Sequence, residues 1–153
     1  MDATTLARRL LRIAPADRPG LEVLHAVDGA ARVTLTTPDR RANGLGALHA
    51  GELVTILDAA GLAAVLSGCD DEVEATGLTL IGGSATMDFR GLARGRLVGE
   101  CVLDDEGRGA LRRLLSGECG RARLGTLTEV TDDTGAVVAS GTFRWSLRCR
   151  APG

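Results

Sequence analysis

One carboxylate stands in the middle of an apolar run that is typical of a buried helix. Asp58 lies within residues 53–66, where its neighbours are Leu, Val, Ile, Ala and Gly with a single Thr. Removing an unpaired carboxylate from water is costly unless its pKa shifts or partners come from elsewhere. A general base or a nucleophile is one reason to keep a carboxylate in such a place. The alternative is a structural carboxylate, satisfied by backbone groups or by Thr55.

The start of this run carries residues that suit a developing negative charge. Ala50 and Gly51 are predicted at the helix N-terminus, where backbone N–H groups lack intrahelical acceptors and the helix dipole is positive. Such donors suit the oxygen of a carbonyl group under attack. Asn43 and His49 precede them, in a chain that has one Asn and two His. Each alone is typical of a loop or a helix start, but their joint placement favours a shared role.

Asp58 and Ala50 are too far apart to act together within one chain. Eight residues of α-helix rise by about 12 Å. If both act on one substrate, Asp58 of one copy must approach Ala50 of a second copy. A two-fold axis between antiparallel helices would create two such sites, so we expect a homodimer.

The elements that must position these residues begin with a helix and a hairpin. Residues 4–13 predict a short amphipathic helix, because Leu and Ile recur on one helical face. Residues 21–27 and 31–37 flank Asp28 and Gly29, a two-residue hairpin signal. The long apolar helix is predicted over about 50–66.

The remainder is mostly strand. Strands are predicted at about 74–81, 84–90, 96–103, 122–131 and 136–149. Gly82 and Gly83 are interpreted as a possible bulge within one long strand. Residues 107–116 predict a small extra helix, which would shape either a substrate pocket or an oligomer contact. We expect one domain over residues 1–153, of class α+β, in which an antiparallel sheet of five to six strands wraps around the long helix.

Composition excludes several classes of function. A net charge of -2 and an aromatic content of 2% do not fit a nucleic-acid-binding surface. Cysteine and histidine spacing matches no zinc site, so we expect no metal and free thiols in a reducing cytoplasm. The chain shows no secretory leader and no apolar run of about 20 residues, so we expect neither export nor a membrane.

The motif Asn43-x5-His49-Ala50-Gly51-x6-Asp58 resembles hot-dog-fold acyl-CoA thioesterases, in the branch of the phenylacetate-pathway and 4-hydroxybenzoyl-CoA enzymes. Strand-rich sequence follows, with Thr134–Thr142 near its end, and the resemblance covers about residues 21–149. It implies a hot-dog fold, a substrate that is an acyl-CoA or an acyl-carrier thioester, no cofactor, and a homodimer that pairs into a tetramer.

The resemblance also implies roles for individual residues. Asp58 matches the catalytic carboxylate, acting as general base on water or as nucleophile, and the Ala50 N–H matches the oxyanion donor. Asn43 matches a residue that helps to place the water or carboxylate, and His49 one that supports the carbonyl site. Ala50 stands where the family usually has Gly, which raises the question of whether its N–H keeps the required direction.

Further candidates come from the strand after the helix. Arg90, Arg94 and Arg96 follow it where similar proteins meet the CoA phosphates, and a planar guanidinium suits phosphate. A solvated turn is the alternative. Thr79 and Ser84 are both left open as hydroxyls that could face the catalytic carboxylate.

Two other functions compete with thioester hydrolysis. A hot-dog hydratase or dehydratase shares the architecture, but such enzymes tend to show Asp-x4-His, whereas Asp39 and His49 are ten residues apart. A non-catalytic acyl-thioester-binding or scaffold protein would bind acyl-CoA without releasing thiol.

Overall fold

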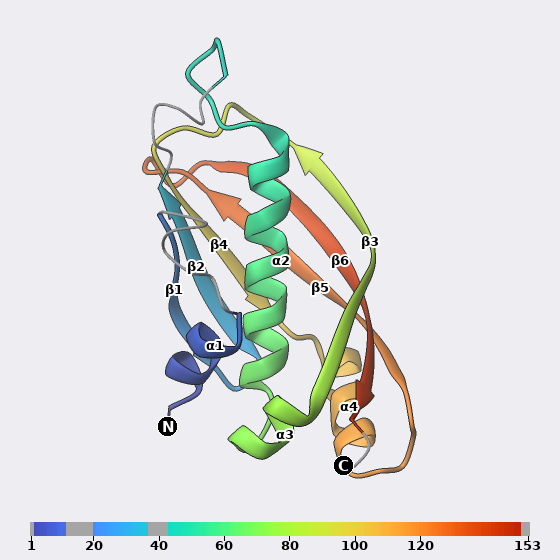
Figure 1. Cartoon of the computed structure of the whole chain (residues 1–153). Coiled ribbons are helices and arrows are strands. Elements are labelled where there is room, and N and C mark those ends of the chain that lie inside the picture. The colour runs from blue at the N-terminus through green and yellow to red at the C-terminus, as the bar shows by residue number, and fades with distance from the viewer. Residues whose placement is uncertain (1, 12–19, 37–42, 151–153) are drawn as a thin grey trace.

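The computed structural model describes residues 2–11, 20–36 and 43–150. Its elements in chain order are α1 (Ala3–Leu11), β1 (Leu21–Val27), β2 (Ala30–Thr36), α2 (Ala50–Ser67), α3 (Glu72–Gly77), β3 (Leu78–Phe89), β4 (Arg96–Val102), α4 (Asp105–Leu115), β5 (Ala122–Thr131) and β6 (Val137–Cys149). The strands form one six-stranded antiparallel sheet in the order β1-β2-β4-β5-β6-β3. The sheet curves around α2 (Figure 1), which confirms the predicted α+β architecture with its short N-terminal helix.

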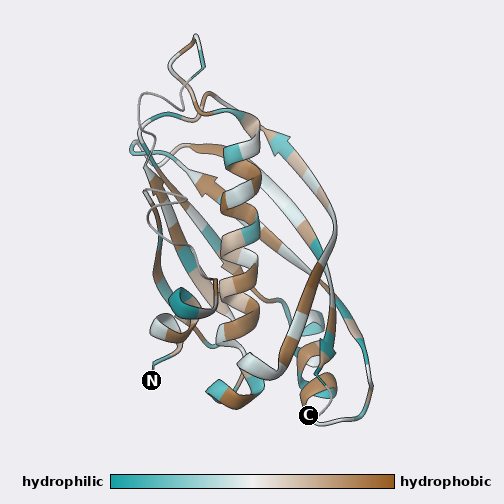
Figure 2. Ribbon diagram, in the orientation of Figure 1, coloured by the Kyte–Doolittle hydropathy of each residue, from teal (hydrophilic) through white to brown (hydrophobic). Residues whose placement is uncertain are grey.

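Helix α2 forms the centre of the core. Apolar residues run along most of its length (Figure 2), and its sheet-facing side chains are buried. By length and composition alone it could cross a membrane, with 18 residues and a mean hydropathy of 1.5, but 61% of that window is buried inside the fold. A helix enclosed by a sheet has this composition because apolar groups surround it on most sides.

Two glycines of the sheet allow α2 to lie close to it. A Cβ atom at Gly99 in β4 would collide with Cγ2 of Ile56, and a Cβ atom at Gly141 in β6 would collide with Cδ2 of Leu57. Both helix residues are fully buried. Because interiors are close-packed, these contacts fix the rotation of α2 about its axis.

The first hairpin matches the sequence prediction. Asp28 and Gly29 connect β1 to β2 with φ angles of 48° and 76°. Positive φ at both central residues is the requirement of a type I′ turn, which matches the twist of the flanking strands. Strand β2 is described to Thr36, and the predicted last residue, Thr37, lies outside the described residues.

One predicted strand boundary is wrong. Residues 74–77, predicted as the start of a strand, belong to the short helix α3. The Asp71 side chain accepts a hydrogen bond from the Glu74 N–H, and the Glu74 carboxylate accepts one from the Asp70 N–H. These two bonds satisfy donors at the helix start as a capping box does.

The long strand and the extra helix are confirmed. β3 is continuous, and its register with β6 shifts between Gly82 and Ser84, as a bulge requires. Helix α4 begins two residues before the predicted boundary of 107, because Asp104 caps it by accepting from the Gly107 N–H at 2.7 Å.

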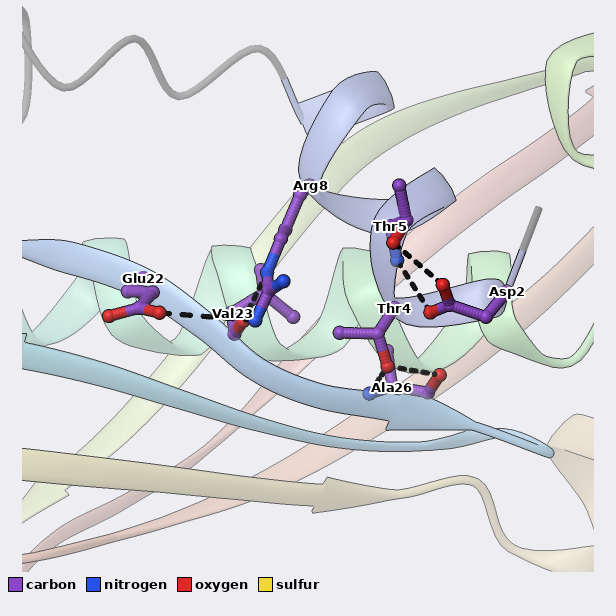
Figure 3. A network of polar contacts seen from close by, with 7 residues as sticks. All are labelled: Asp2, Thr4, Thr5, Arg8, Glu22, Val23 and Ala26. Carbon is purple, nitrogen blue, oxygen red and sulfur yellow. Dashed lines mark hydrogen bonds and ion pairs between the residues drawn. The ribbon is translucent and has the colours of Figure 1, made fainter.

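Helix α1 covers the outer edge of β1 (Figure 3). The Thr4 hydroxyl exchanges hydrogen bonds with both backbone groups of Ala26, and Arg8 Nε donates to the Val23 carbonyl at 2.8 Å. An edge strand whose backbone groups are engaged in this way is a poor template for pairing with another chain. The described part of the predicted helix 4–13 ends at Leu11.

The four cysteines are free thiols, as predicted. Burial raises the pKa of Cys69 to about 12, with a further contribution from Glu74 and neighbouring carboxylates. Burial likewise raises the pKa of Cys101 to about 11. Both thiols are therefore protonated at neutral pH.

Candidate active site

The loop that leads into α2 is organised by the side chain of Asn43. Its Oδ1 accepts hydrogen bonds from the N–H groups of Leu45 at 2.8 Å and Ala47 at 3.2 Å. Its own backbone N–H donates to the Ala47 carbonyl at 2.7 Å. Within the described part of the chain, nothing accepts from its Nδ2 group. Asn43 is a turn-forming residue here, and the substrate-facing role that the resemblance implies stays a prediction.

A second loop supports the first. The Leu48 N–H donates to the Ala93 carbonyl at 2.8 Å, and Arg94 Nη2 donates to the Leu45 carbonyl at 2.8 Å. Ala47, Leu48 and Ala93 are buried, so the Leu48–Ala93 contact is shielded from water, whereas the Arg94–Leu45 contact is exposed. The chain is thus held up to Leu48, two residues before α2 begins.

The backbone N–H groups that lack intrahelical acceptors come just after this supported loop. His49 is the N-cap residue of α2, with φ -65° and ψ 145°, and its exposed side chain makes no capping hydrogen bond. Ala50 and Gly51 open the helix and are exposed, so their N–H groups point away from the helix without an intrahelical acceptor. A Cβ atom built at Gly51 would meet no atom within 4 Å, which leaves room in front of the helix end.

The alanine at position 50 does not disturb this geometry. Neither Ala50 nor Gly51 has a positive φ angle. Since Ala50 adopts helical backbone geometry, a Cβ atom adds no strain and the N–H keeps the direction of a first-turn helix amide. Glycine is therefore not required here for the donor to point outward.

Asp58 lies on the side of α2 that the sheet leaves open. Successive helix residues are rotated by about 100°. Ile56 contacts β4 and Leu57 contacts β6, so the same rotation carries Asp58 past β6 toward β3. Leu57 packs at Gly141, which pairs with Met87, so Asp58 lies at the level of Met87.

The burial of Asp58 differs from the prediction. The apolar run predicted burial nearly all round, but a stripe of α2 is exposed or half-buried, and Asp58 is half-buried on it. The stripe also includes Gly51, Val54 and Leu62, which share this side of the helix by their spacing. Within one chain Asp58 and the Ala50 amide are not brought together, because eight helical residues separate them by about 12 Å.

Neither hydroxyl left open by the sequence faces α2. Thr79 pairs with Arg148 and Ser84 pairs with Arg144, and both arginines lie on the outer, exposed face of the sheet. Paired residues of antiparallel strands share a face. The β3 residue nearest to Asp58 in level on the inner face is Met87, so this chain presents an apolar side chain there.

The three arginines proposed for phosphate binding do not converge on one point. Arg90 Nη2 donates to the Ser140 hydroxyl at 3.3 Å, and Arg96 Nε donates to the Thr34 hydroxyl at 3.0 Å. Arg94 contacts the loop of Asn43, as described above. All three remain exposed, and their role toward phosphate stays a prediction.

Sequence reasoning did not identify the half-buried apolar side chains of α2, β3 and β6. Leu62 on α2, Met87 on β3 and Phe143 on β6 are half-buried and pack against the core. The Phe143 ring stacks on Trp145, with centroids 4.3 Å apart. The alternation of apolar and polar residues along β6 contains this signal, since Phe143 and Trp145 are two residues apart and therefore share a face.

Two grooves lie away from Asp58. One of about 650 Å³ lies between the N-terminus of α4 and the outer sheet face, beside Arg123 and Arg144. Another of about 580 Å³ lies between α4 and the end of α2, beside Gly68 and Arg112. Neither is lined by Asp58. Among the described residues, no three His, Cys, Asp or Glu side chains gather as a metal site would require.

A six-stranded antiparallel sheet wrapped around one long helix is the hot-dog fold, and comparison with solved structures confirms it. No protein-family model matches the sequence, and no curated protein matches it either. The chain is similar to a Pseudomonas aeruginosa protein of unknown function described as a probable thioesterase. The two share 28% identity and a TM-score of 0.76 over 97% of this chain and 94% of that one.

Two more distant structures share the fold. One is the Escherichia coli PaaI protein from the phenylacetic acid degradation operon, at 20% identity and TM-score 0.67 over 99% of this chain and 98% of that one. The other is a hypothetical Streptococcus pneumoniae thioesterase with coenzyme A, at 19% identity and TM-score 0.65 over 90% of this chain and 94% of that one. The resemblance inferred from the motif is thus confirmed at the level of the thioesterase-type hot-dog fold.

Proposed function

We propose that the protein hydrolyses an acyl thioester at sites shared by two copies of the chain. Asp58 of one copy acts on water or on the acyl carbon, and the Ala50 N–H of the other stabilises the oxyanion. The observation on which the proposal depends is the position of Asp58. Its side chain is half-buried on the open side of α2, and the amides at the start of the same helix have no intrahelical acceptor. Similarity to structures described as thioesterases supports the reaction class.

The chemistry follows from these groups. When Asp58 acts as a base, it takes a proton from water while the water oxygen attacks the carbonyl carbon, and the carbonyl oxygen gains negative charge beside the Ala50 N–H. Collapse expels the thiolate, which takes up a proton, and leaves the free acid. When Asp58 acts as a nucleophile, an anhydride forms first and water then hydrolyses it.

The helix geometry defines where the two-fold axis must pass. For Asp58 of one helix to meet Ala50 of an antiparallel partner, the axis must cross α2 midway, at Val54. Val54 lies on the open stripe and is 37% exposed. An apolar side chain that is exposed in one chain and located at the axis supports burial against its own copy.

The two edges of the sheet differ in exposure, and this difference favours dimerisation on the side of β3. Side chains of α1 engage the backbone of β1, whereas β3 is exposed along most of its length and carries Ile81 and Phe89, each 56% exposed. Leu45 and Leu92, at the end of the molecule where α2 begins, are 66% and 49% exposed. Apolar exposure on this side supports a homodimer in which β3 and α2 are covered by the partner.

The substrate we propose is an acyl-CoA, with an acyl-carrier thioester as the alternative carrier. Coenzyme A in the Streptococcus pneumoniae structure supports this choice. Leu62, Met87 and Phe143 would contact the acyl group, which is therefore apolar. Val102 and Leu127, 61% and 62% exposed on the outer face of the sheet, support a second contact that pairs dimers into a tetramer. We propose that the enzyme works in the cytoplasm and uses no cofactor.

The test is release of free thiol from a panel of acyl-CoAs, followed with a thiol reagent. The wild-type protein should release thiol, and Asp58→Asn should lower turnover by about 10² or more, the scale of losing a positioned base. Asp105→Asn, an exposed carboxylate in the first turn of α4, is the matched control and should leave turnover unchanged. Saturable binding without thiol release would support the non-catalytic alternative, and hydration of an enoyl-CoA would support the hydratase.

A further inference from the structure

We infer that Arg94 is a positioning residue for the oxyanion donors, and that it does not bind the phosphates of the substrate. Its guanidinium holds the loop of residues 43–48, on which the start of α2 rests. This inference deepens the proposed function and rests on it. It gives Arg94 a role different from the phosphate contact that the resemblance implied and from the alternative of a solvated turn.

The contacts of Leu45 carry the inference. Leu45 lies at the exposed tip of the loop. Its carbonyl accepts a hydrogen bond from Arg94 Nη2 at 2.8 Å, and its N–H donates to Asn43 Oδ1 at 2.8 Å. Three residues later, the Leu48 N–H donates to the Ala93 carbonyl at 2.8 Å. Arg94 and Ala93 therefore hold the loop at two points from the same neighbouring segment.

That neighbouring segment is itself fixed at both ends. At its start, the Arg90 N–H donates to the Val138 carbonyl of β6 at 2.8 Å. At its end, Gly95 turns the chain with φ 67° and the Arg96 N–H donates to Asp133 Oδ2 at 3.3 Å. Between these points Ala93 is 2% exposed. Arg94 thus projects from a segment anchored to the sheet, so it can transmit that rigidity to the loop.

The anchor on β5 and β6 is a compact turn. Asp132 Oδ1 accepts from the N–H and hydroxyl groups of Thr134 and from the Ala136 N–H. The Thr134 hydroxyl holds the pKa of the Asp132 carboxyl below its usual value, because its hydrogen bond favours the charged carboxylate. Asp133, which receives the Arg96 N–H, lies within this turn.

The consequence concerns the amides of Ala50 and Gly51. They lie two and three residues after Leu48, and no hydrogen bond to another described element holds them. Misplacement of a catalytic group by about 1 Å can cost about 10² in rate. Loss of the Arg94 contact leaves the Ala93 contact in place, so we expect a smaller loss in kcat, of about tenfold. KM should change little, because Arg94 touches the protein and not the substrate.

The experiment compares an acyl-CoA with the same acyl group on N-acetylcysteamine, a thiol that carries no phosphate. If Arg94 positions the loop, Arg94→Ala lowers kcat by the same factor on both substrates and leaves both KM values unchanged. If Arg94 binds phosphate, the KM for acyl-CoA rises and hydrolysis of the N-acetylcysteamine thioester is unaffected, which would overturn the inference. Arg112→Ala, an exposed arginine on α4, is the matched control.

A second readout separates this inference from the proposed function. Hydrogen exchange at the amides of residues 45–48, which are hydrogen-bonded within the loop and to Ala93, should accelerate in Arg94→Ala and not in Arg112→Ala. Unchanged exchange at these amides would contradict the loop-holding role whatever the activity. Absence of thiol release by the wild-type protein on both substrates would instead refute the proposed hydrolysis, and accelerated exchange would still stand as evidence for the loop contact.

Discussion

The Ala50 N–H can be removed with little effect on the fold, which makes its proposed role open to a direct test. Ala50 is the first residue of α2, and its N–H has no intrahelical acceptor. Proline is well tolerated at this helix position, since its fixed φ suits a helix and its missing N–H breaks no helical bond. The residue before a proline must be extended, and His49 already has φ -65° and ψ 145°. Ala50→Pro is therefore compatible with the backbone on both sides.

Ala50→Pro should lower the rate of hydrolysis and leave the stability of the fold nearly unchanged. Removing one oxyanion donor lowers kcat by about 10² to 10³. The side chain at position 50 is exposed, so the proline ring displaces no core atom, and the melting temperature should stay close to that of the wild-type protein. Thiol release should be measured under saturating and limiting acyl-CoA, so that kcat and KM are separated.

The control is Ala50→Gly, which keeps the N–H and restores the residue that is usual in similar proteins. It should retain activity near that of the wild type. If Ala50→Pro is folded and dimeric and hydrolyses acyl-CoA at the wild-type rate, the amide at position 50 is not the oxyanion donor. Equal losses in Ala50→Pro and Ala50→Gly would point to backbone mobility and would likewise refute the reasoning.

Three further predictions concern assembly, packing and thiol chemistry. Val54→Arg should place like charges at the proposed two-fold axis, so sedimentation should show a monomer and thiol release should fall. If the variant dimerises as the wild-type protein does, the two-fold axis does not pass at Val54. Gly141→Ala should lower the free energy of unfolding by about 1–3 kcal/mol through overpacking, while Gly120→Ala, whose Cβ atom meets nothing within 4 Å, should stay close to wild type in denaturant titration. At pH 8 an alkylating reagent should modify exposed Cys149 before half-buried Cys69 and buried Cys101. Because the pKa of Cys69 is raised to about 12, its rate should climb as pH rises toward that value, and equal rates for Cys149 and Cys69 at pH 8 would contradict this account.

Local signals in the sequence predicted most elements of the fold. The Asp28 and Gly29 turn, the break at Gly82 and Gly83, and the apolar length of α2 each depend on a few adjacent residues, and the structure bears out all three. Helix α3 was missed because its apolar content resembles a strand, although the spacing of Asp71 and Glu74 carried a capping signal. The strand order, with β3 beside β6 at the sheet edge, depends on long-range pairing that adjacent residues do not encode.

The candidate site was predictable in part. Types and spacing placed Ala50 and Gly51 at a helix start and Asp58 on the same helix, as the structure has them. The half-burial of Asp58 was not predictable, because it depends on β3 lying beyond β6 and leaving one side of α2 open. The contact of Arg94 with Leu45 was not predictable, because it joins two loops far apart in sequence.

The central claim is that each catalytic site takes Asp58 from one copy and the Ala50 amide from another, and subunit mixing tests it most directly. Asp58→Asn and Ala50→Pro should each be nearly inactive alone. After unfolding and refolding together, half of the dimers should contain one copy of each, and each such dimer has one intact site. Thiol release should then recover to about a quarter of the wild-type value. Activity of the mixture equal to the average of the two separate variants would contradict a site shared between copies.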